Sequence, residues 1–272
     1  MESYSYINGK IVPSNEARVS VYDLGFLRGY GVFDFLRTEK GKPLYLEQHL
    51  DRLERSVQEV SLNMPLSRED IKDIISILLR KNNFKESVFR IIITGGEMES
   101  DFKGKKPSVF VLHNKFVPLP EDYYKKGVKV LTREYQRTFP VSKTLDYLVG
   151  ASEQPKAERE GVFEIVFVKD GLVLEARTSN IFIIKSRKVI TPKNNILLGI
   201  TREKVINTIK KEFEIEERNI ELKELISADE VFLTATNKNV LPVVNVDGEN
   251  IGNGKVGNIT KRIMKLYKES LS

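Results

Sequence analysis

The stretch Val141-Ser142-Lys143-Thr144-Leu145-Asp146-Tyr147-Leu148 decides how this chain is interpreted. Lys143 stands just before a predicted helix, and the apolar residues and the tyrosine around it indicate that the lysine is partly buried. A desolvated lysine loses its proton more readily than an exposed one and becomes a nucleophile toward aldehydes. The stretch therefore predicts a reactive lysine, and the rest of the chain indicates what surrounds it.

A carboxylate with two possible roles closes a later predicted strand. Glu175 ends the apolar run Leu172–Glu175, and the polar turn Ala176–Ser179 leads into the next strand. Such a residue is either an exposed carboxylate at a strand end or an acid partner for the protonated ring nitrogen of a cofactor, which acts as an electron sink. Both interpretations remain open from the residues alone.

Two segments are suited to binding a phosphate. In Leu198-Gly199-Ile200-Thr201-Arg202-Glu203, a glycine gives room for a turn and Thr201 can cap the helix that follows. The exposed N–H groups and the dipole of such a helix start favour an anion. A predicted strand also runs into the small polar residues Thr234–Lys238, which include Thr236. Arg52, just off the apolar stripe of a predicted helix, is a further candidate for a functional residue, with a surface arginine as the alternative.

The N-terminal part predicts a small α+β domain over 1–116. Asn8-Gly9 marks a two-residue hairpin turn within Tyr4–Val12. Helices are expected at Leu46–Val60 and after the N-cap Ser67. Strands are expected at Val32–Leu36, Leu44–Leu46, Val88–Thr94 and Ser108–His113, and residues 95–107 predict a mobile polar loop.

The remainder predicts a larger, β-rich domain over 123–272, joined by a linker at 117–122 that two prolines stiffen. The chain is thus expected to be an α+β protein of two domains with its site in the cleft between them, where ligands commonly bind. Strands are expected near 128–132, 163–168, 172–175, 180–184, 230–234 and 242–246, and helices near 147–159, 201–213 and 256–269.

Composition excludes several classes of protein. The 272 residues include no cysteine, so there is no disulfide framework or cysteine-based zinc site, and two histidines are too few for a His-rich metal centre. The formal net charge is +6, but the basic residues are interspersed with acidic ones rather than clustered, so nucleic-acid binding is not expected. Without an N-terminal signal peptide or a membrane span, the expectation is a soluble cytoplasmic protein.

One motif is rejected. Gly252-Asn253-Gly254-Lys255-Val256-Gly257 matches the G-x-G-x-x-G pattern of dinucleotide-binding folds, which needs a following βαβ unit and an acidic residue about 20 positions on. Too little chain follows Gly257 for that unit, so the segment is interpreted as a turn that leads into the last helix.

Together these segments resemble the fold-type IV (class IV) aminotransferases, which depend on pyridoxal 5′-phosphate (PLP). That family includes D-amino acid aminotransferases, branched-chain aminotransferases and aminodeoxychorismate lyases. The resemblance runs through nearly the whole chain in order, and is carried by Tyr6–Gly9, Gly25–Phe33, His49–Leu53, Lys143–Tyr147, Glu175–Asn180, Gly199–Arg202 and Leu241–Val243.

The resemblance implies a role for each candidate. Lys143 would carry the cofactor and move the proton at the substrate Cα, and Glu175 would pair with the pyridine nitrogen. Tyr147 would lie near the cofactor phenolate and Phe33 on the substrate side. The phosphate would be bound by Arg52, Ile200, Thr201 and Thr236. No metal is implied.

The sequence departs from the family where the substrate α-carboxylate binds. Asp146 replaces the usual asparagine, and Asn237–Asn239 replace the small residues that bind the carboxylate in branched-chain enzymes. The arginine that binds it in familiar D-amino acid enzymes is replaced by Gly95. The resemblance implies no role for Arg177 or Lys238.

Two arginines are candidates to replace these groups, because guanidinium binds carboxylate through two parallel hydrogen bonds. Arg90 lies on a strand that is otherwise apolar on both faces, so its charge is expected to be buried. Arg28 lies in a loop that, in family dimers, reaches the active site of the neighbouring subunit. The chain thus resembles an atypical D-amino acid aminotransferase that acts as a homodimer.

The leading expectation is transamination between a D-amino acid, such as D-glutamate or D-alanine, and a 2-oxo acid, 2-oxoglutarate or pyruvate. Phe33 and Tyr147 favour the alternative of a branched-chain L-aminotransferase. An aminodeoxychorismate lyase is the third candidate. The preferred side chain and any activity on primary amines stay open.

Overall fold

The computed structural model describes residues 3–271. The chain divides into two compact units, unit 1 with residues 1–117 and 142–146, and unit 2 with residues 118–141 and 147–272. The predicted linker at 117–122 thus lies at the first boundary, but residues 142–146 return to unit 1. The segment that carries Lys143 is therefore part of unit 1, not of the C-terminal unit in which the sequence placed it.

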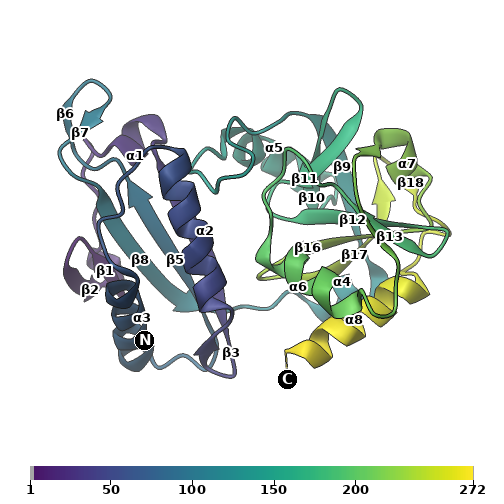
Figure 1. The fold of residues 1–272 in the computed structure, drawn as a ribbon, viewed down its shortest axis with the longest axis horizontal. Coiled ribbons are helices and arrows are strands. Elements are labelled where there is room, and N and C mark those ends of the chain that lie inside the picture. The colour runs from purple at the N-terminus through teal and green to yellow at the C-terminus, as the bar shows by residue number, and fades with distance from the viewer. Residues whose placement is uncertain (1–2, 272) are drawn as a thin grey trace. The chain divides into compact units, whose positions relative to one another are not determined.

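Unit 1 is a six-stranded sheet with two helices on one face, as Figure 1 shows. The strand order is β2-β1-β8-β5-β3-β4. The strands are β1 (Tyr4–Ile7), β2 (Lys10–Pro13), β3 (Gly31–Glu39), β4 (Lys42–Pro43), β5 (Ser87–Thr94) and β8 (Ser108–Lys115). The helices are α1 (Leu24–Arg28), α2 (Leu46–Glu59) and α3 (Arg68–Asn82), with a 3-10 turn at Ser14–Glu16.

Local signals in unit 1 are confirmed where short-range chemistry determines the structure. Asn8 and Gly9 have positive φ and close the β1–β2 hairpin with Ile7 opposite Lys10. Ser67 caps α3 in a capping box with Asp70. The apolar stripes of α2 and α3 pack on the sheet; Leu50, Leu53, Ile71 and Leu78 are fully buried there.

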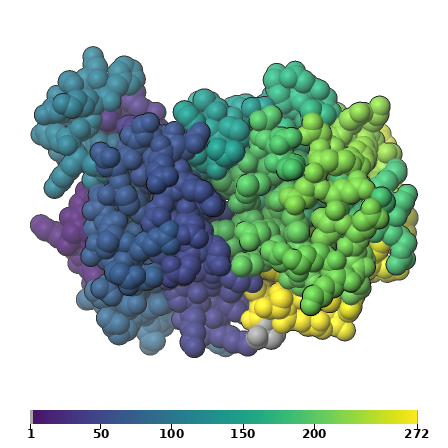
Figure 2. All heavy atoms as spheres, in the orientation of Figure 1, coloured from purple at the N-terminus to yellow at the C-terminus, as the bar shows by residue number. Residues whose placement is uncertain are grey.

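Two expectations in unit 1 are wrong. Residues 95–107 contain a short hairpin, β6 (Met98–Ser100) paired with β7 (Lys103–Gly104), where the sequence predicted an unstructured loop. The hairpin projects from the rest of unit 1 in Figure 1 and Figure 2. Leu44–Leu46 is not a strand, because Leu46 already begins α2.

Unit 2 is built on a large curled sheet with the order β14-β13-β12-β16-β17-β9-β10-β11-β15, and β18 pairs with β17. Its strands are β9 (Val128–Glu134), β10 (Glu164–Lys169), β11 (Leu172–Ala176), β12 (Asn180–Lys185), β13 (Lys188–Thr191), β14 (Ile215–Glu217), β15 (Ile220–Glu221), β16 (Glu230–Ala235), β17 (Asn239–Val246) and β18 (Glu249–Asn250). Its helices are α4 (Glu121–Lys126), α5 (Leu148–Arg159), α6 (Ile200–Ile209), α7 (Leu222–Ile226) and α8 (Asn258–Ser270).

Both faces of this sheet are covered, which explains why its strands are continuously apolar rather than alternating. On β12, Ile181 and Ile183 point into the core that the curled sheet encloses. Phe182 and Ile184 point outward, where they pack with residues of α6 and α8. The turns at the ends of the strands are therefore held on a rigid frame. Within residues 3–271 no helix is both long enough and apolar enough to cross a membrane.

Candidate active site

Lys143 is held as part of a short extra strand on the edge of β3. Thr144 forms a β-bridge with Val32, and the backbone N–H of Phe33 donates to the Lys143 carbonyl oxygen at 2.8 Å. The N–H of Lys143 donates to the Ser56 hydroxyl of α2 at 3.1 Å. The backbone on which the lysine stands is therefore fixed, and its side chain is half-buried, as the sequence predicted.

The lysine shares its environment with Phe33 and Arg90. Lys143 Nζ lies 4.5 Å from the ring centroid of Phe33, and Arg90 Cζ lies 5.9 Å from the same centroid. Arg90 also contacts the ring of Phe35, its partner in the β3–β5 pairing. The expectation of a buried Arg90 is wrong. It is exposed, because it shares the less buried face of β5 with Val88 and Ile92, whereas Phe89 and Ile91 point into the core.

Arg52 is buried in unit 1 and paired with an acid. Its Nε and Nη2 donate to the two carboxylate oxygens of Asp34 at 2.8 and 2.9 Å, and His49 Nδ1 lies 2.6 Å from the same carboxylate. Burial would raise the pKa of Asp34, but Arg52 and His49 hold it well below its usual range. Burial lowers the pKa of His49 below its usual value, although the Asp34 carboxylate beside it acts in the opposite direction. Arg52 Nη1 has no hydrogen-bond partner within residues 3–271 and stays available as a donor.

Glu175 belongs to unit 2, where it is also buried and ionically paired. The Arg137 guanidinium donates from Nε and Nη2 to Glu175 Oε1 at 2.8 and 2.7 Å. The backbone N–H of Leu197 donates to the other oxygen, Oε2, at 3.0 Å. Both side chains are less than a tenth exposed. Glu175 is therefore not an exposed strand-end carboxylate. Arg137 is a residue that sequence reasoning missed, since no local pattern marks the partner of a carboxylate 38 positions away.

The loop that contains Leu197 connects Glu175 with the start of α6. Asn180 Nδ2 donates to the Leu197 carbonyl oxygen at 2.7 Å. A Cβ at Gly199 would lie 2.1 Å from Asn180 Oδ1, so only glycine fits at this close approach. Gly199 supplies no side-chain cap to α6. The Thr201 hydroxyl, which makes no hydrogen bond within residues 3–271, and the first N–H groups of the helix are thus left to an external acceptor.

The start of α8 differs from that of α6, because a carboxylate already accepts its first N–H groups. At α8, Glu230 accepts the N–H groups of Ile259 and Thr260 at 3.0 and 2.6 Å. That carboxylate occupies the helix start next to the G-x-G-x-x-G segment at 252–257. The rejection of that segment as a nucleotide site is therefore consistent with the structure.

The remaining candidates lie on loops or helix ends. Thr236 is half-buried in the turn between β16 and β17, and Tyr147 is the N-cap residue of α5. Arg28 is exposed at the end of α1, where its guanidinium lies 5.5 Å from the ring centroid of Phe102. Lys143, Phe33, Arg90, Arg52 and Arg28 are thus in unit 1, whereas the other predicted site residues, Glu175, Tyr147, Ile200, Thr201 and Thr236, are in unit 2.

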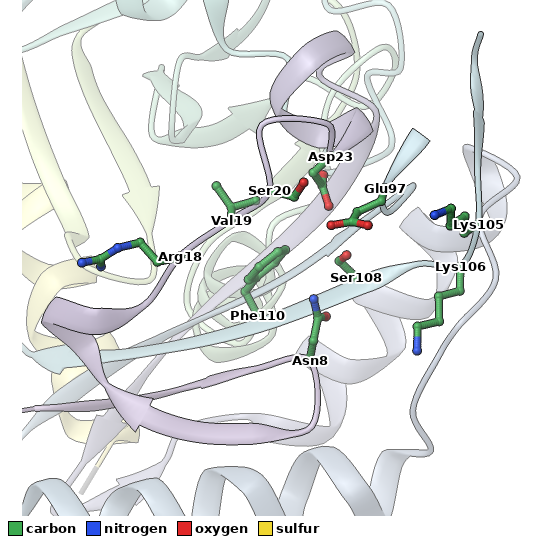
Figure 3. A pocket seen from close by; sticks show the side chains of 10 residues that line it. All are labelled: Asn8, Arg18, Val19, Ser20, Asp23, Glu97, Lys105, Lys106, Ser108 and Phe110. Atoms are coloured by element: carbon green, nitrogen blue, oxygen red, sulfur yellow. The ribbon is translucent and has the colours of Figure 1, made fainter. Parts of the chain in front are cut away.

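A pocket of about 280 Å³ opens elsewhere in unit 1, between the β1–β2 turn, the segment before α1 and the start of β8. Figure 3 shows the side chains that line it, among them Arg18, Lys105, Lys106 and the buried Asp23. No predicted site residue lines it. Asp23 is engaged by the Gly25 N–H and the Thr94 hydroxyl, so it is a structural group. Within residues 3–271 no cluster of acidic or histidine side chains could hold a metal ion.

Comparison with known proteins identifies the family to which the chain belongs. Residues 31–246 match the family model described as amino-transferase class IV. The chain is 35% identical to a Methanocaldococcus jannaschii protein named "Putative branched-chain-amino-acid aminotransferase", over 97% of this chain and 95% of the relative. It is 31% identical to D-alanine aminotransferase of Staphylococcus haemolyticus, over 97% of this chain and 96% of the relative.

Solved structures of the family share the fold. A branched-chain amino acid aminotransferase of T.th. with pyridoxamine 5′-phosphate, the amino form of PLP, superposes with a TM-score of 0.91 at 25% identity. That match covers all of this chain and 94% of the other. The enzyme of Thermoproteus uzoniensis with norvaline gives 0.90 at 26% identity, with 100% and 95% covered. This chain therefore belongs to the class IV aminotransferases, enzymes that use PLP.

Proposed function

We propose that this protein transfers an amino group between a D-amino acid, such as D-glutamate or D-alanine, and 2-oxoglutarate or pyruvate. The observation that carries the proposal is Arg90, which is exposed and lies against the same aromatic ring as Lys143. The relatives include both D-alanine and branched-chain aminotransferases, so membership of the family leaves the stereochemical preference to be tested.

The residues present are suited to PLP. The uncapped start of α6, with Ile200 and Thr201, offers N–H and hydroxyl donors to a phosphate, and Arg52 keeps one free donor nitrogen while Asp34 fixes its other side. We assign Thr236 to the same phosphate. Glu175, a buried carboxylate paired with Arg137, suits a protonated pyridine nitrogen. Tyr147 is assigned to the cofactor phenolate.

When bound, PLP supplies an electron sink for the carbanion that forms at the substrate Cα. Lys143 would supply the amine that carries the cofactor, and its Nζ would remove and return the proton at Cα. The β-bridge to Val32 and the contact with Ser56 hold its backbone in place. Glu175 would stabilise the protonated ring nitrogen of the bound cofactor, and its own charge is stabilised by Arg137 and by the Leu197 N–H.

Gly95 supports a carboxylate site that differs from that of familiar D-amino acid enzymes. A Cβ at Gly95 would lie 2.6 Å from Cδ1 of Tyr30, whose hydroxyl donates to the Val60 carbonyl at 3.0 Å. Tyr30 thus fills the space that an arginine at position 95 would need. Arg90 lies over the ring of Phe33, as Lys143 does, and we assign it to the substrate carboxylate.

The branched-chain alternative rests on Phe33. An aromatic ring 4.5 Å from Lys143 Nζ makes the surroundings of the lysine apolar, which also suits a leucine or isoleucine side chain. In that case Arg90 would bind the distal carboxylate of glutamate rather than the α-carboxylate.

We also propose that the active form is a homodimer, with Arg28 near the active site of the neighbouring subunit. Large apolar side chains are exposed on unit 1 over the segment before α1, α1 itself and the β6–β7 hairpin. Val21 is 63%, Phe26 68% and Phe102 76% exposed, and such a surface is typical of a protein interface. Light scattering at micromolar concentration tests this, and Phe26→Lys should give monomers if the surface is the interface.

A substrate screen with paired D- and L-amino acids tests the function. We expect the wild type to prefer D-glutamate or D-alanine over L-leucine. Arg90→Ile should raise the KM for D-amino acids by about 10- to 100-fold, because charged hydrogen bonds contribute ~1.5–3 kcal/mol. Arg28→Ala should give a smaller defect of the same kind. Clear preference for L-leucine, with Arg90→Ile impairing only glutamate, would instead make this a branched-chain enzyme.

A further inference from the structure

A cluster of polar side chains in unit 2, buried except for Thr178, has no role in the chemistry proposed above. It consists of Lys238, Glu164, Thr178 and Ser179, and we call it the Lys238 cluster. Lys238 is 5% exposed, although it lies in the turn between β16 and β17, and Glu164 at the start of β10 is fully buried. Their charged atoms, Nζ and Oε2, are 2.7 Å apart. A lysine directed inward from a turn needs an explanation, because an exposed position would cost nothing.

Every strong hydrogen-bonding atom of the cluster is used. Lys238 Nζ donates to Glu164 Oε2, to the Thr178 hydroxyl at 2.5 Å and to the Ser179 hydroxyl at 2.8 Å, so its three protons all have acceptors. Glu164 Oε1 accepts from both the N–H and the hydroxyl of Thr178 at 2.6 Å. Its Oε2 also accepts from the Ser179 hydroxyl at 2.8 Å. The four side chains therefore form one connected hydrogen-bond network.

Stability alone does not account for such a network. Burial would raise the pKa of Glu164, and it is Lys238 that holds this pKa below its usual value. Desolvating the two charges cancels much of their attraction, so apolar residues of the same size would serve stability equally well. Unlike apolar contacts, the ion pair and its hydrogen bonds have a defined geometry. They connect the turn that holds Lys238 to the turn that holds Thr178 and Ser179 in a fixed position.

These two turns carry residues of the proposed cofactor site. The turn with Thr178 and Ser179 directly follows Glu175 and leads to Asn180. Asn180 pairs with Thr234 of β16 and lies against Gly199 at the start of α6. The other turn contains Thr236, two residues before Lys238. Tyr124 of α4 donates to the Lys238 carbonyl oxygen at 3.0 Å, which fixes this second turn from its other side.

We propose that Lys238, paired with Glu164, is a positioning residue that sets the distance between the turn after Glu175 and the turn that carries Thr236. The inference rests on the proposed assignment of these two residues to the ring nitrogen and the phosphate of PLP. Lys238 touches neither group. It keeps Thr236 and Glu175 at a fixed distance from each other. A rigid cofactor can then contact Thr236 with its phosphate and Glu175 with its ring nitrogen at the same time.

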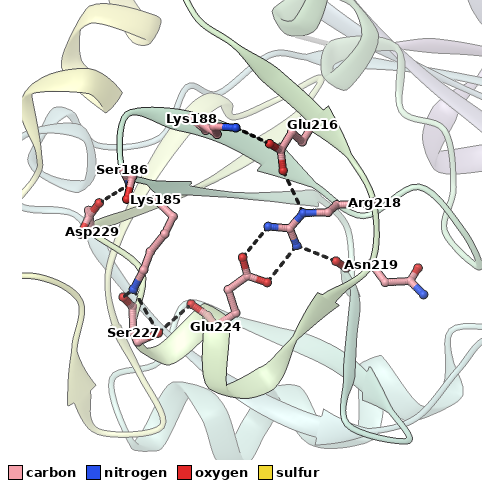
Figure 4. Close-up of polar contacts among 9 residues, drawn as sticks. All are labelled: Lys185, Ser186, Lys188, Glu216, Arg218, Asn219, Glu224, Ser227 and Asp229. Atoms are coloured by element: carbon pink, nitrogen blue, oxygen red, sulfur yellow. Dashed lines mark hydrogen bonds and ion pairs between the residues drawn. The ribbon is translucent and has the colours of Figure 1, made fainter.

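The test compares PLP binding with stability in four proteins. Lys238→Met removes the cation and leaves the buried Glu164 carboxylate without its ion-pair partner. The double variant Lys238→Met/Glu164→Gln removes both charges and keeps the volumes, so it should fold even if the single variant does not. Arg218→Met is the matched control: it breaks ion pairs with Glu216 and Glu224 in unit 2, far along the chain from both turns (Figure 4).

PLP affinity is measured by fluorescence titration of the apo proteins, and stability by their thermal unfolding. We expect the double variant to melt near the wild type but to bind PLP about 10- to 100-fold more weakly, whereas Arg218→Met should bind PLP normally whatever its melting temperature. A double variant that binds PLP as the wild type does would overturn the inference. If the wild type itself fails to bind PLP, the proposed function fails first, which the same titration reveals separately.

Discussion

Removing Arg137 tests the electrostatics of the proposed site most sharply, because it leaves Glu175 in place and withdraws only its partner. Arg137 donates twice to Glu175 Oε1, and the two side chains are 7% and 8% exposed. In Arg137→Met the carboxylate loses this cation while it stays buried. The N–H of Leu197 still donates to its other oxygen, but that donor carries no net charge.

The magnitude follows from that burial. Breaking a buried pair from one side costs ~3–5 kcal/mol, since it leaves an uncompensated charge. Unit 2 is of the size for which ~1 kcal/mol shifts the melting temperature by roughly 2–4 °C, so a fall of roughly 6–20 °C is expected. Without Arg137, the buried Glu175 carboxylate also binds a proton more readily. A neutral Glu175 does not stabilise a protonated ring nitrogen, so turnover should fall.

Two controls separate these effects. Arg137→Lys keeps a cation and should lose less stability. The double variant Arg137→Met/Glu175→Gln has no buried charge and should melt close to the wild type while it remains inactive. Thermal unfolding and turnover against pH are the measurements, and turnover of Arg137→Met should recover as the pH is raised and Glu175 ionises. The reasoning is refuted if Arg137→Met melts like the wild type and keeps its rate.

Three further results are expected. Glu175→Gln should keep PLP bound but lower turnover by more than about 100-fold, as rate and absorbance measurements would show; an unchanged rate would mean that Glu175 is only structural. Burial lowers the pKa of His113 from 6.5 to about 4, so the unfolded chain takes up this proton first. The free energy of unfolding should therefore fall by roughly 3 kcal/mol as the pH drops from about 6.5 to 4, and urea titrations of His113→Phe should lack that contribution. Gly199→Ala should cost ~1–3 kcal/mol and weaken PLP binding, because its Cβ would displace Asn180; a variant with normal affinity would contradict the role given to the start of α6.

Sequence reasoning succeeded where a few neighbouring residues determine the structure. The turn at Asn8-Gly9 and the capping box at Ser67 are such cases, because their hydrogen bonds close within a few positions. The spacing of the apolar residues in α2 and α3 likewise predicts which face of each helix is buried. The family was recognisable because several short motifs occur in order, and the family match over residues 31–246 confirms it.

It failed where partners lie far apart along the chain. Arg90 was expected to be buried because β5 is apolar at nearly every position, yet one face of that strand is only partly covered in unit 1. The pairing of Arg137 with Glu175 spans 38 positions and that of Lys238 with Glu164 spans 74, and neither has a periodic signature. The return of residues 142–146 to β3 depends on strand pairing, which residue spacing does not encode.

The most direct test of the central claim is chemical labelling of the cofactor-bound lysine. The protein is loaded with PLP, reduced with borohydride and digested, and the peptides are analysed by mass spectrometry. The account predicts a phosphopyridoxyl group on Lys143, and a Lys143→Ala variant whose turnover is lower by roughly 10²–10⁴-fold. A label on another lysine, together with full activity of Lys143→Ala, would contradict it.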